Sequence, residues 1–366
     1  MKKPKCEKPT SYNCGNACIN VSKNCRQVPS ESFGRSRLQR LKQISQFYAQ
    51  SKSKSARSLR QKAAADKLVG VVEKARKTEA SELAVDRKII NQARRKARLK
   101  AEAVSKREEL LKLYEGVSET SVTKKGTASL LESENPVRQL KKNKLLYSKK
   151  IKGLSQEDPQ EAERLSARAE RVFNTSNKEA QAFLEKARKL VEVDSPTKLN
   201  SSVKTGTPRS HQKGVEVFQK MISIPGLDTP VNIVDAPPER KGRSYYKPKT
   251  NNVYMGNPDP AVVVHEMSHW LEEKVPGIRE EVESFYEKRT AGEKTVKMSE
   301  VTGNKNYRDD EVTKVDKWLN PYMGKEYKNA SEILSMGMEL MYRNPVYLAK
   351  NDPEMFDFIY SVVRRK

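Results

Sequence analysis

Apolar residues recur at helical spacing along most of the first two hundred positions. One stripe consists of Leu38, Leu41, Ile44 and Phe47, and similar stripes follow as far as about position 190. A spacing of three to four residues is typical of one face of an α-helix, and the intervening Lys, Arg, Gln and Ala favour helices. The stripes are narrow, so each helix buries little surface alone. We therefore expect a basic, extended helical region at residues 33–193, interrupted by polar linkers.

The pattern changes after a Pro/Ser/Thr-rich linker at residues 194–214. Short apolar runs bounded by Gly, Pro and Asn predict strands at residues 231–234, 244–246 and 252–255, the last two joined by a turn. Helical patterns predict further elements at residues 215–222, 278–289, 310–319, 331–342 and 345–363. The expected fold class is α+β and mostly helical, with a small antiparallel sheet in a C-terminal domain of residues 215–366.

The positive charge of the chain is concentrated in its first part. The 366 residues carry a formal net charge of +25. Residues 1–200 contain 46 Lys+Arg and 23 Asp+Glu, a balance of +23, which leaves 72 − 46 = 26 basic and 47 − 23 = 24 acidic residues for positions 201–366. Such asymmetry favours contact with a polyanion such as DNA or with an acidic protein surface. The alternative is a solvated basic helix that binds nothing specific.

The four cysteines all lie within residues 1–28, at Cys6, Cys14, Cys18 and Cys25. They predict a small Cys-containing knob, held either by two disulfides or by one structural zinc ion. The basic N-terminal residues are not followed by an apolar core, so we expect no ordinary signal peptide. No apolar run approaches the length of a membrane span, and we expect no membrane partner.

The motif that carries chemistry is an HExxH sequence within the segment AVVVHEMSHW. On a helix, His265 and His269 share one face and direct two imidazoles at one point, as a tetrahedral Zn²⁺ ion requires. Glu266 lies beside them, placed to accept a proton from water. Asp259 and Pro260 are typical helix-start residues. Two alternatives stay open: a surface helix with two chance histidines, against which their scarcity argues (the chain has 3), and a zinc site that has lost catalysis.

A third protein ligand is expected from elsewhere in the chain. A third histidine six residues after His269 is absent, because Val275 stands there, and His211 lies in the predicted linker. A carboxylate on a later helix is the usual completion, typical of gluzincins. The candidates, in order of preference, are Glu332, Glu339 and Glu311. Glu332 begins an apolar helix, and Ser335, one turn later, is positioned to orient it. As alternatives, Glu332 is a helix-capping residue paired with Asn329, Glu339 a surface or supporting carboxylate, and Glu272 a structural one.

Four segments together resemble a known family. They read VVVHEMSHWLEE, KRTAGEK, NPYMGKEY and SEILSMGMELMYRNPVYLAKNDPEMFDFI, and they occur in order within residues 215–366. They are similar to the metallopeptidase-like domain of minor head and head-morphogenesis proteins of tailed phages and of their prophage relatives. The resemblance implies a zincin-like fold, with His265 and His269 as zinc ligands, Glu266 as base and Glu332 as third ligand. It also implies a location in the virion, in the head or head–neck region, or in the host cytoplasm.

Two functions follow from these observations. The first is a phage-associated, zinc-dependent peptidase that hydrolyses peptide bonds with metal-activated water, with Glu266 as base and Tyr245 or Tyr246 stabilising the oxyanion. The partner of this peptidase is a peptide or protein substrate. The alternative is a structural virion protein whose basic helical arm binds capsid, portal or DNA and whose metal domain is non-catalytic.

Overall fold

The computed structural model describes residues 11–14, 17–20, 89–117, 122–204, 208–327 and 331–365. The chain divides into two units, residues 1–95 and 96–366. In the first unit, β1 (Ser11–Cys14) and β2 (Ala17–Asn20) pair in antiparallel fashion. Cys14 and Cys18 lie on these strands, whereas Cys6 and Cys25 fall outside the described residues. The choice between disulfides and zinc for the predicted knob therefore stays a prediction.

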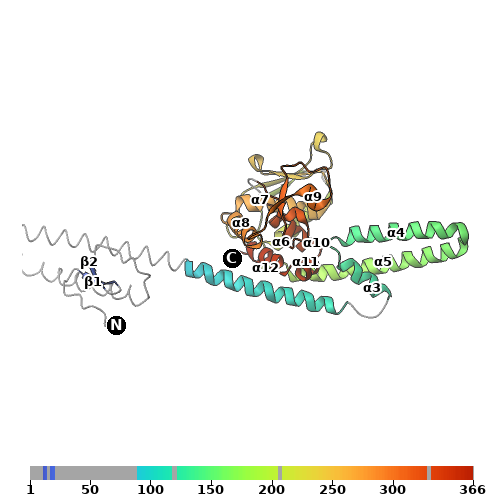
Figure 1. Ribbon diagram of the computed structural model, residues 1–366, viewed down its shortest axis with the longest axis horizontal. Coiled ribbons are helices and arrows are strands. Elements are labelled where there is room, and N and C mark those ends of the chain that lie inside the picture. Colours follow the sequence, from blue (N-terminus) through green and yellow to red (C-terminus); the bar gives the residue numbers. More distant parts are fainter. Residues whose placement is uncertain are drawn as a thin grey trace, which may run out of the picture. The chain divides into compact units, whose positions relative to one another are not determined.

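Long helices open the second unit, as the apolar stripes predict. Residues 96–115 are helical, and α3 (Val122–Leu131), α4 (Pro136–Glu157) and α5 (Pro159–Leu190) follow. The α4–α5 hairpin extends away from the rest of the unit (Figure 1). Asp158 ends α4 and also caps α5, because its side chain accepts the backbone N–H of Glu161 at 3.0 Å, and Pro159 suits the first helical position. The chain thus reverses direction without a separate loop.

The central sheet has four strands in the order β3-β4-β6-β5. Their bounds are β3 (Ser201–Val203), β4 (Val231–Asp235), β5 (Tyr245–Lys247) and β6 (Asn252–Met255). The predicted antiparallel pair is present in β5 and β6. The β4–β6 and β3–β4 pairs are parallel, so the sheet is mixed, and the expectation of an antiparallel sheet was wrong for these strands. Because the chain passes through β5 at the sheet edge before returning as β6, β6 runs in the same direction as β4.

Helix α7 (Pro260–Lys274) occupies the centre of the C-terminal region. It packs against α6 (Arg209–Met221), α10 (Ile333–Arg343) and the strands β5 and β6. A Cβ atom on Gly214 of α6 would lie 2.4 Å from the Cβ of Val263 and 2.9 Å from the carbonyl oxygen of Pro260. Glycine therefore permits the close approach of α6 to α7. Most apolar residues of the HExxH segment, which include Val264, Met267 and Trp270, are fully buried.

Further helices surround α7, and two predicted elements differ from those found. The others are α8 (Ile278–Arg289), α9 (Met298–Thr302), α11 (Pro345–Asn351) and α12 (Pro353–Val362), with one-turn helices η1 (Pro238–Arg240), η2 (Pro248–Thr250) and η3 (Pro321–Gly324). The predicted helix at residues 310–319 was wrong: β8 (Val312–Lys314) pairs there with β7 (Thr295–Lys297). The β-branched Val312 and Thr313 favour a strand. The segment predicted as a linker, 194–214, contains β3 and the first turns of α6.

The expected fold class is confirmed, since the described chain is a mostly helical α+β protein with small mixed and antiparallel sheets. The helix at residues 96–115 is attached to α12 by Arg107, which pairs with Asp357 at 2.9 Å, and by Tyr360, which donates to Glu102 at 2.7 Å. Among the described residues, no helix has both the length and the apolar character needed to cross a bilayer. The division of the chain into four segments, residues 1–28, 33–193, 194–214 and 215–366, stays a prediction.

Candidate metal centre

The helix that carries the HExxH motif begins as its sequence predicts. The Asp259 side chain accepts the backbone N–H of Ala261 at 2.9 Å, and Pro260 occupies the first position. A second interaction fixes this cap, because Arg343 of α10 donates to the other Asp259 oxygen at 2.6 Å. Helices α7 and α10 are thus joined by charge at one end as well as by apolar packing. The motif lies on the second and third turns, where α7 faces α10.

Three side chains converge between these helices. His265 and His269 lie on successive turns of α7, and Glu332 lies immediately before α10. The Glu332 Oε2 atom is 3.2 Å from His265 Nε2 and 3.4 Å from His269 Nε2. The ligand atoms of all three residues lie within 4.8 Å of one another. We call this set the His-His-Glu triad, and it could hold a metal ion.

The spacing within the triad fits a zinc ion. Zinc binds nitrogen and oxygen ligands at about 2.0–2.1 Å in tetrahedral geometry, which places neighbouring ligand atoms roughly 3.3–3.4 Å apart. The distances from Glu332 to the two histidines, 3.2 and 3.4 Å, match this edge length. Two imidazoles and one carboxylate leave the fourth position open, as a catalytic zinc site requires. The donor set and two of its three spacings therefore suit zinc, and the third spacing, between the two histidines, lies within 4.8 Å.

Hydrogen bonds from neighbouring side chains orient the residues of the triad. His265 donates from Nδ1 to Glu339 Oε2 at 2.9 Å, and this contact leaves Nε2 directed at the triad. Glu339 in turn accepts a hydrogen bond from Arg343 at 2.7 Å, and Ser335 donates to Glu332 at 2.9 Å. A carboxylate on the far imidazole nitrogen fixes the tautomer and orientation of a metal-binding histidine. Glu339 thus has the geometry of a supporting residue, whereas Glu332 has that of a ligand.

We expect Glu339→Gln to weaken zinc binding by roughly ten- to a hundredfold while one zinc ion can still be bound at saturation. The amide removes the negative charge that orients and polarises His265, but it leaves the three ligand atoms in place. Competition with a fluorescent zinc chelator measures the change. Glu354→Gln, at an exposed position that pairs with Lys288, is the matched control. Complete loss of zinc in Glu339→Gln would show that Glu339 is itself a ligand.

The acid–base state of the triad is set by its carboxylates. Burial opposes a positive charge on His265, but hydrogen bonds to Glu332 and Glu339 outweigh it and raise the pKa of His265 to about 10. Burial alone would raise the pKa of Glu332, yet its hydrogen bonds to both histidines hold this pKa well below its usual range. The metal-free triad therefore stores a proton on His265 at neutral pH, and a bound metal ion must displace it.

Glu266, the predicted base, lies beside the triad and is 7% exposed. Burial raises the pKa of its carboxyl group, although the nearby His265 and His269 oppose the shift. The backbone N–H of Tyr246 on β5 donates to the same carboxylate. A carboxylate with a raised pKa accepts a proton more readily near neutral pH. Glu266 thus interacts with both histidines of the triad and, through the Tyr246 backbone, with the edge strand β5.

The other carboxylate and histidine candidates lie apart from the triad. Glu311 accepts a charged hydrogen bond from Lys325 at 2.5 Å. Glu272 is buried, with its nearest cation, Arg279, at 4.0 Å, and burial raises its pKa to about 7. His211 is buried in α6, with Nε2 3.4 Å from the carbonyl oxygen of Asn257. His211 is therefore a core residue and does not belong to a linker.

The tyrosines nearest Glu332 were not predicted. Tyr245 stacks on Tyr254, and Tyr246 interacts with Glu273. The hydroxyls of Tyr322 and Tyr327 lie 2.6 Å apart, and both interact with Glu332. Burial and the Glu332 charge raise the pKa of Tyr322 to about 12. The segment NPYMGKEY contains both residues, but its turn-like sequence does not indicate which way their side chains point.

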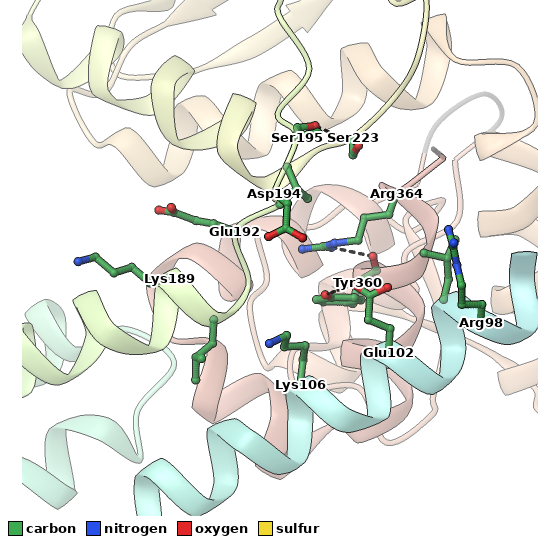
Figure 2. A pocket seen from close by; sticks show the side chains of 13 residues that line it. Arg98, Glu102, Lys106, Lys189, Glu192, Asp194, Ser195, Ser223, Tyr360 and Arg364 are labelled. Carbon is green, nitrogen blue, oxygen red and sulfur yellow. Dashed lines mark hydrogen bonds between the residues drawn. The ribbon is translucent and has the colours of Figure 1, made fainter.

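A polar pocket of about 330 Å³ lies away from the triad, between residues 98–106, the end of α5 and α12 (Figure 2). Arg364 reaches into its wall, donates to the carbonyl oxygens of Tyr360 and Val191, and lies 3.4 Å from the Tyr360 ring centre. Burial lowers the pKa of Arg364 to about 10. Both basic and acidic side chains line the pocket, and they come from the helix at residues 96–115, the end of α5 and the C-terminal segment.

Comparisons with protein-family models, with curated proteins and with solved structures found no match to this chain.

Proposed function

We propose that the protein is a zinc-dependent hydrolase of peptide bonds. The observation that carries the proposal is the His-His-Glu triad with Glu266 beside it on the same helix. Zinc supplies Lewis acidity when it is bound there, and this acidity polarises a carbonyl group and lowers the pKa of water. Among the described residues, no other group of side chains could hold a metal ion with a buried carboxylate next to it. The arrangement is that of metal-assisted hydrolysis.

The chain's own residues have separate parts in this reaction. Glu266 accepts a proton from the attacking water and returns it to the departing amine. An extended peptide pairs with the free edge of β5, which brings its backbone next to Glu266. Tyr322 and Tyr327, which lie against Glu332, are positioned to donate a hydrogen bond to the oxygen that gains charge. These two tyrosines replace Tyr245 and Tyr246 as our candidates for that part.

The resemblance of the four C-terminal segments to phage head proteins supplies the biological setting of the proposal. In that setting, the substrate is a protein of the phage particle or of its host. A structural role in the virion is the second candidate. One observation favours it: α4 carries seven Lys and Arg residues against one Glu, and all seven are exposed. Salt-sensitive binding of the full chain to duplex DNA would support this candidate, whereas no binding at low salt would remove DNA as the partner.

Removal of zinc is expected to abolish hydrolysis reversibly. The full chain, loaded with zinc, is incubated with a peptide library, and the new amino termini are quantified by mass spectrometry. We expect cleavage to disappear after 1,10-phenanthroline treatment and to return when zinc, but not magnesium, is restored, because the triad offers two nitrogen ligands. Equal release of new termini by the zinc-loaded and zinc-free protein would contradict the proposal.

A further inference from the structure

The free edge of the sheet is unusually basic. Strand β5 is last in the strand order, so no strand among the described residues pairs with its outer edge. Residues 237–250, which contain this strand, include one acidic residue, Glu239, and five exposed basic residues, a balance of 5 − 1 = +4. The five are Arg240, Lys241, Arg243, Lys247 and Lys249, and we call them the basic rim. The whole segment 201–366 has a balance of only +2, so the charge is concentrated at this edge.

The basic rim lies next to the proposed reaction centre. Tyr246 of β5 donates its backbone N–H to the Glu266 carboxylate, and β5 packs on α7. A peptide paired with this edge would thus pass the triad and the rim at the same time. Within the described part of the chain, no carboxylate forms an ion pair with any of the five rim side chains. Their charges are therefore available to a ligand.

Two of the rim charges, those of Arg240 and Lys247, lie on one face of the sheet. Tyr245 stacks on Tyr254 with ring centres 4.8 Å apart, and the Arg240 guanidinium lies 4.9 Å from the Tyr245 ring centre. Lys247 shares this face, because it lies two residues after Tyr245 on the strand. Tyr246 points to the other face, toward Glu273 of α7. An added strand has the same alternation, so every second side chain of a bound peptide would meet the cations.

The loop that carries the first part of the rim is held in place. The backbone N–H of Arg243 donates to the carbonyl oxygen of Arg240 at 3.0 Å, and Ser244 Oγ accepts the N–H of Gly256 at 3.1 Å. A Cβ on Gly256 would lie 2.4 Å from the Arg243 nitrogen, so the loop packs directly on this glycine. Gly242 has a φ of 84°, which favours glycine. The backbone that carries these cations is thus preorganised, which reduces the entropy lost on binding.

We propose that the basic rim selects substrates with acidic side chains on alternate residues of an extended segment. This inference rests on the proposed function and names its substrate class. Asp or Glu at every second position would place carboxylates opposite Arg240 and Lys247, while the intervening side chains face α7. Cations at both ends of β5 attract an acidic peptide and repel a basic one. A nucleic acid fits this edge less well, since strand pairing requires a peptide backbone.

Cleavage and binding are measured separately to test the proposal. The zinc-loaded wild type is incubated with a peptide library, and enrichment of Asp and Glu around the cleaved bonds is scored against Glu266→Gln. Binding is followed by fluorescence polarisation, with zinc-loaded Glu266→Gln and three labelled eight-residue peptides that alternate Val with Glu, Gln or Lys. We expect the Glu peptide to bind at least about tenfold more tightly than the Lys peptide at low salt, with the difference shrinking as salt is added.

Charge reversal in the rim provides the matched comparison. Arg240→Glu combined with Lys247→Glu is expected to cancel or invert the preference, whereas Lys305→Glu combined with Lys317→Glu, at two exposed positions outside the rim, should leave it unchanged. Cleavage without acidic enrichment, or a preference that survives the rim reversal, would overturn the inference and leave the proposed function standing. Rim-dependent binding without any zinc-dependent cleavage would overturn the proposed function alone. Equal binding of the three peptides, or binding of duplex DNA that the rim reversal abolishes, would also overturn the inference.

Discussion

The Glu332→Ala variant is expected to contain one zinc ion per chain fewer than the wild type. Among the residues that the structure describes, Glu332 is the only carboxylate that contacts the Nε2 atoms of both His265 and His269, at 3.2 and 3.4 Å. Structural zinc sites with four protein ligands bind with roughly 10–16 kcal/mol, or about 3 kcal/mol for each ligand. Loss of one ligand therefore weakens binding by about a hundredfold or more. Elemental analysis of purified protein, before and after dialysis against a weak chelator, measures the loss.

The comparison with Glu339→Ala decides which carboxylate is the ligand. Glu339 contacts Nδ1 of His265 and not the triad side of the ring, so its removal should weaken zinc binding without abolishing it. Glu354→Ala, at an exposed position, controls for the loss of any carboxylate. Circular dichroism and thermal unfolding show whether each variant is folded. Zinc retained in Glu332→Ala and lost in Glu339→Ala would reverse the assignment made here.

The local signals around the HExxH motif were sufficient to predict its helix. Asp259 and Pro260 mark the start, and Val275 ends it, as the Pro-Gly pair that follows predicts. Among the described residues, the structure groups Glu332, and not Glu339, with the two histidines, and its role as the third ligand stays a prediction. The helix was predictable because its start, its end and its spacing depend on residues within one or two helical turns, whereas Glu332 was favoured by the start of its own helix and by the family resemblance. Spacing along one helix determines which side chains share a face.

Several features that depend on packing between distant segments were not predicted. The parallel pairing of β4 with β6 arises because β5 takes the outer position, and no local pattern specifies strand order. His211 was assigned to a polar linker because its neighbours are polar, yet it is buried where α6 crosses α7. Tyr322 and Tyr327 face Glu332 from a one-turn helix and the residues after it. The directions of such side chains are set by tertiary contacts that a periodicity does not contain.

For the basic helical region, the sequence predicted where the positive charge lies but not which charges are engaged in ion pairs. The charge balance placed the positive residues before position 200, and the exposed face of α4 agrees with that distribution. Residues 94–100 contain five basic residues, Arg94, Arg95, Lys96, Arg98 and Lys100. Within this cluster, Lys96 pairs with Glu281 at 3.2 Å, which engages one of these charges inside the protein. A count of charges therefore locates a basic region but does not separate binding surfaces from internal pairs.

Glu266→Gln is expected to reduce zinc-dependent peptide hydrolysis by roughly a hundred- to ten-thousandfold while zinc content stays unchanged. A positioned general base contributes about this much to a proton-transfer step, and the glutamine amide has no lone pair basic enough to replace it. Glu266 contacts no ligand nitrogen of the triad in the described hydrogen bonds, so its charge is not needed to hold the metal ion. Initial rates on peptides identified from the library, with zinc measured in the same samples, test both statements.

Glu273→Gln is the matched control, because Glu273 lies on the same helix and also interacts with β5, through Tyr246, yet it lies outside the triad. Burial raises the pKa of Glu266, so the wild-type rate should fall on the acid side as this carboxylate becomes protonated. The variant should lose that dependence, because an amide does not titrate in this range. A Glu266→Gln protein that keeps its zinc and hydrolyses as fast as the wild type would remove Glu266 from the mechanism. A wild type that binds zinc and cleaves no peptide would instead favour the structural role.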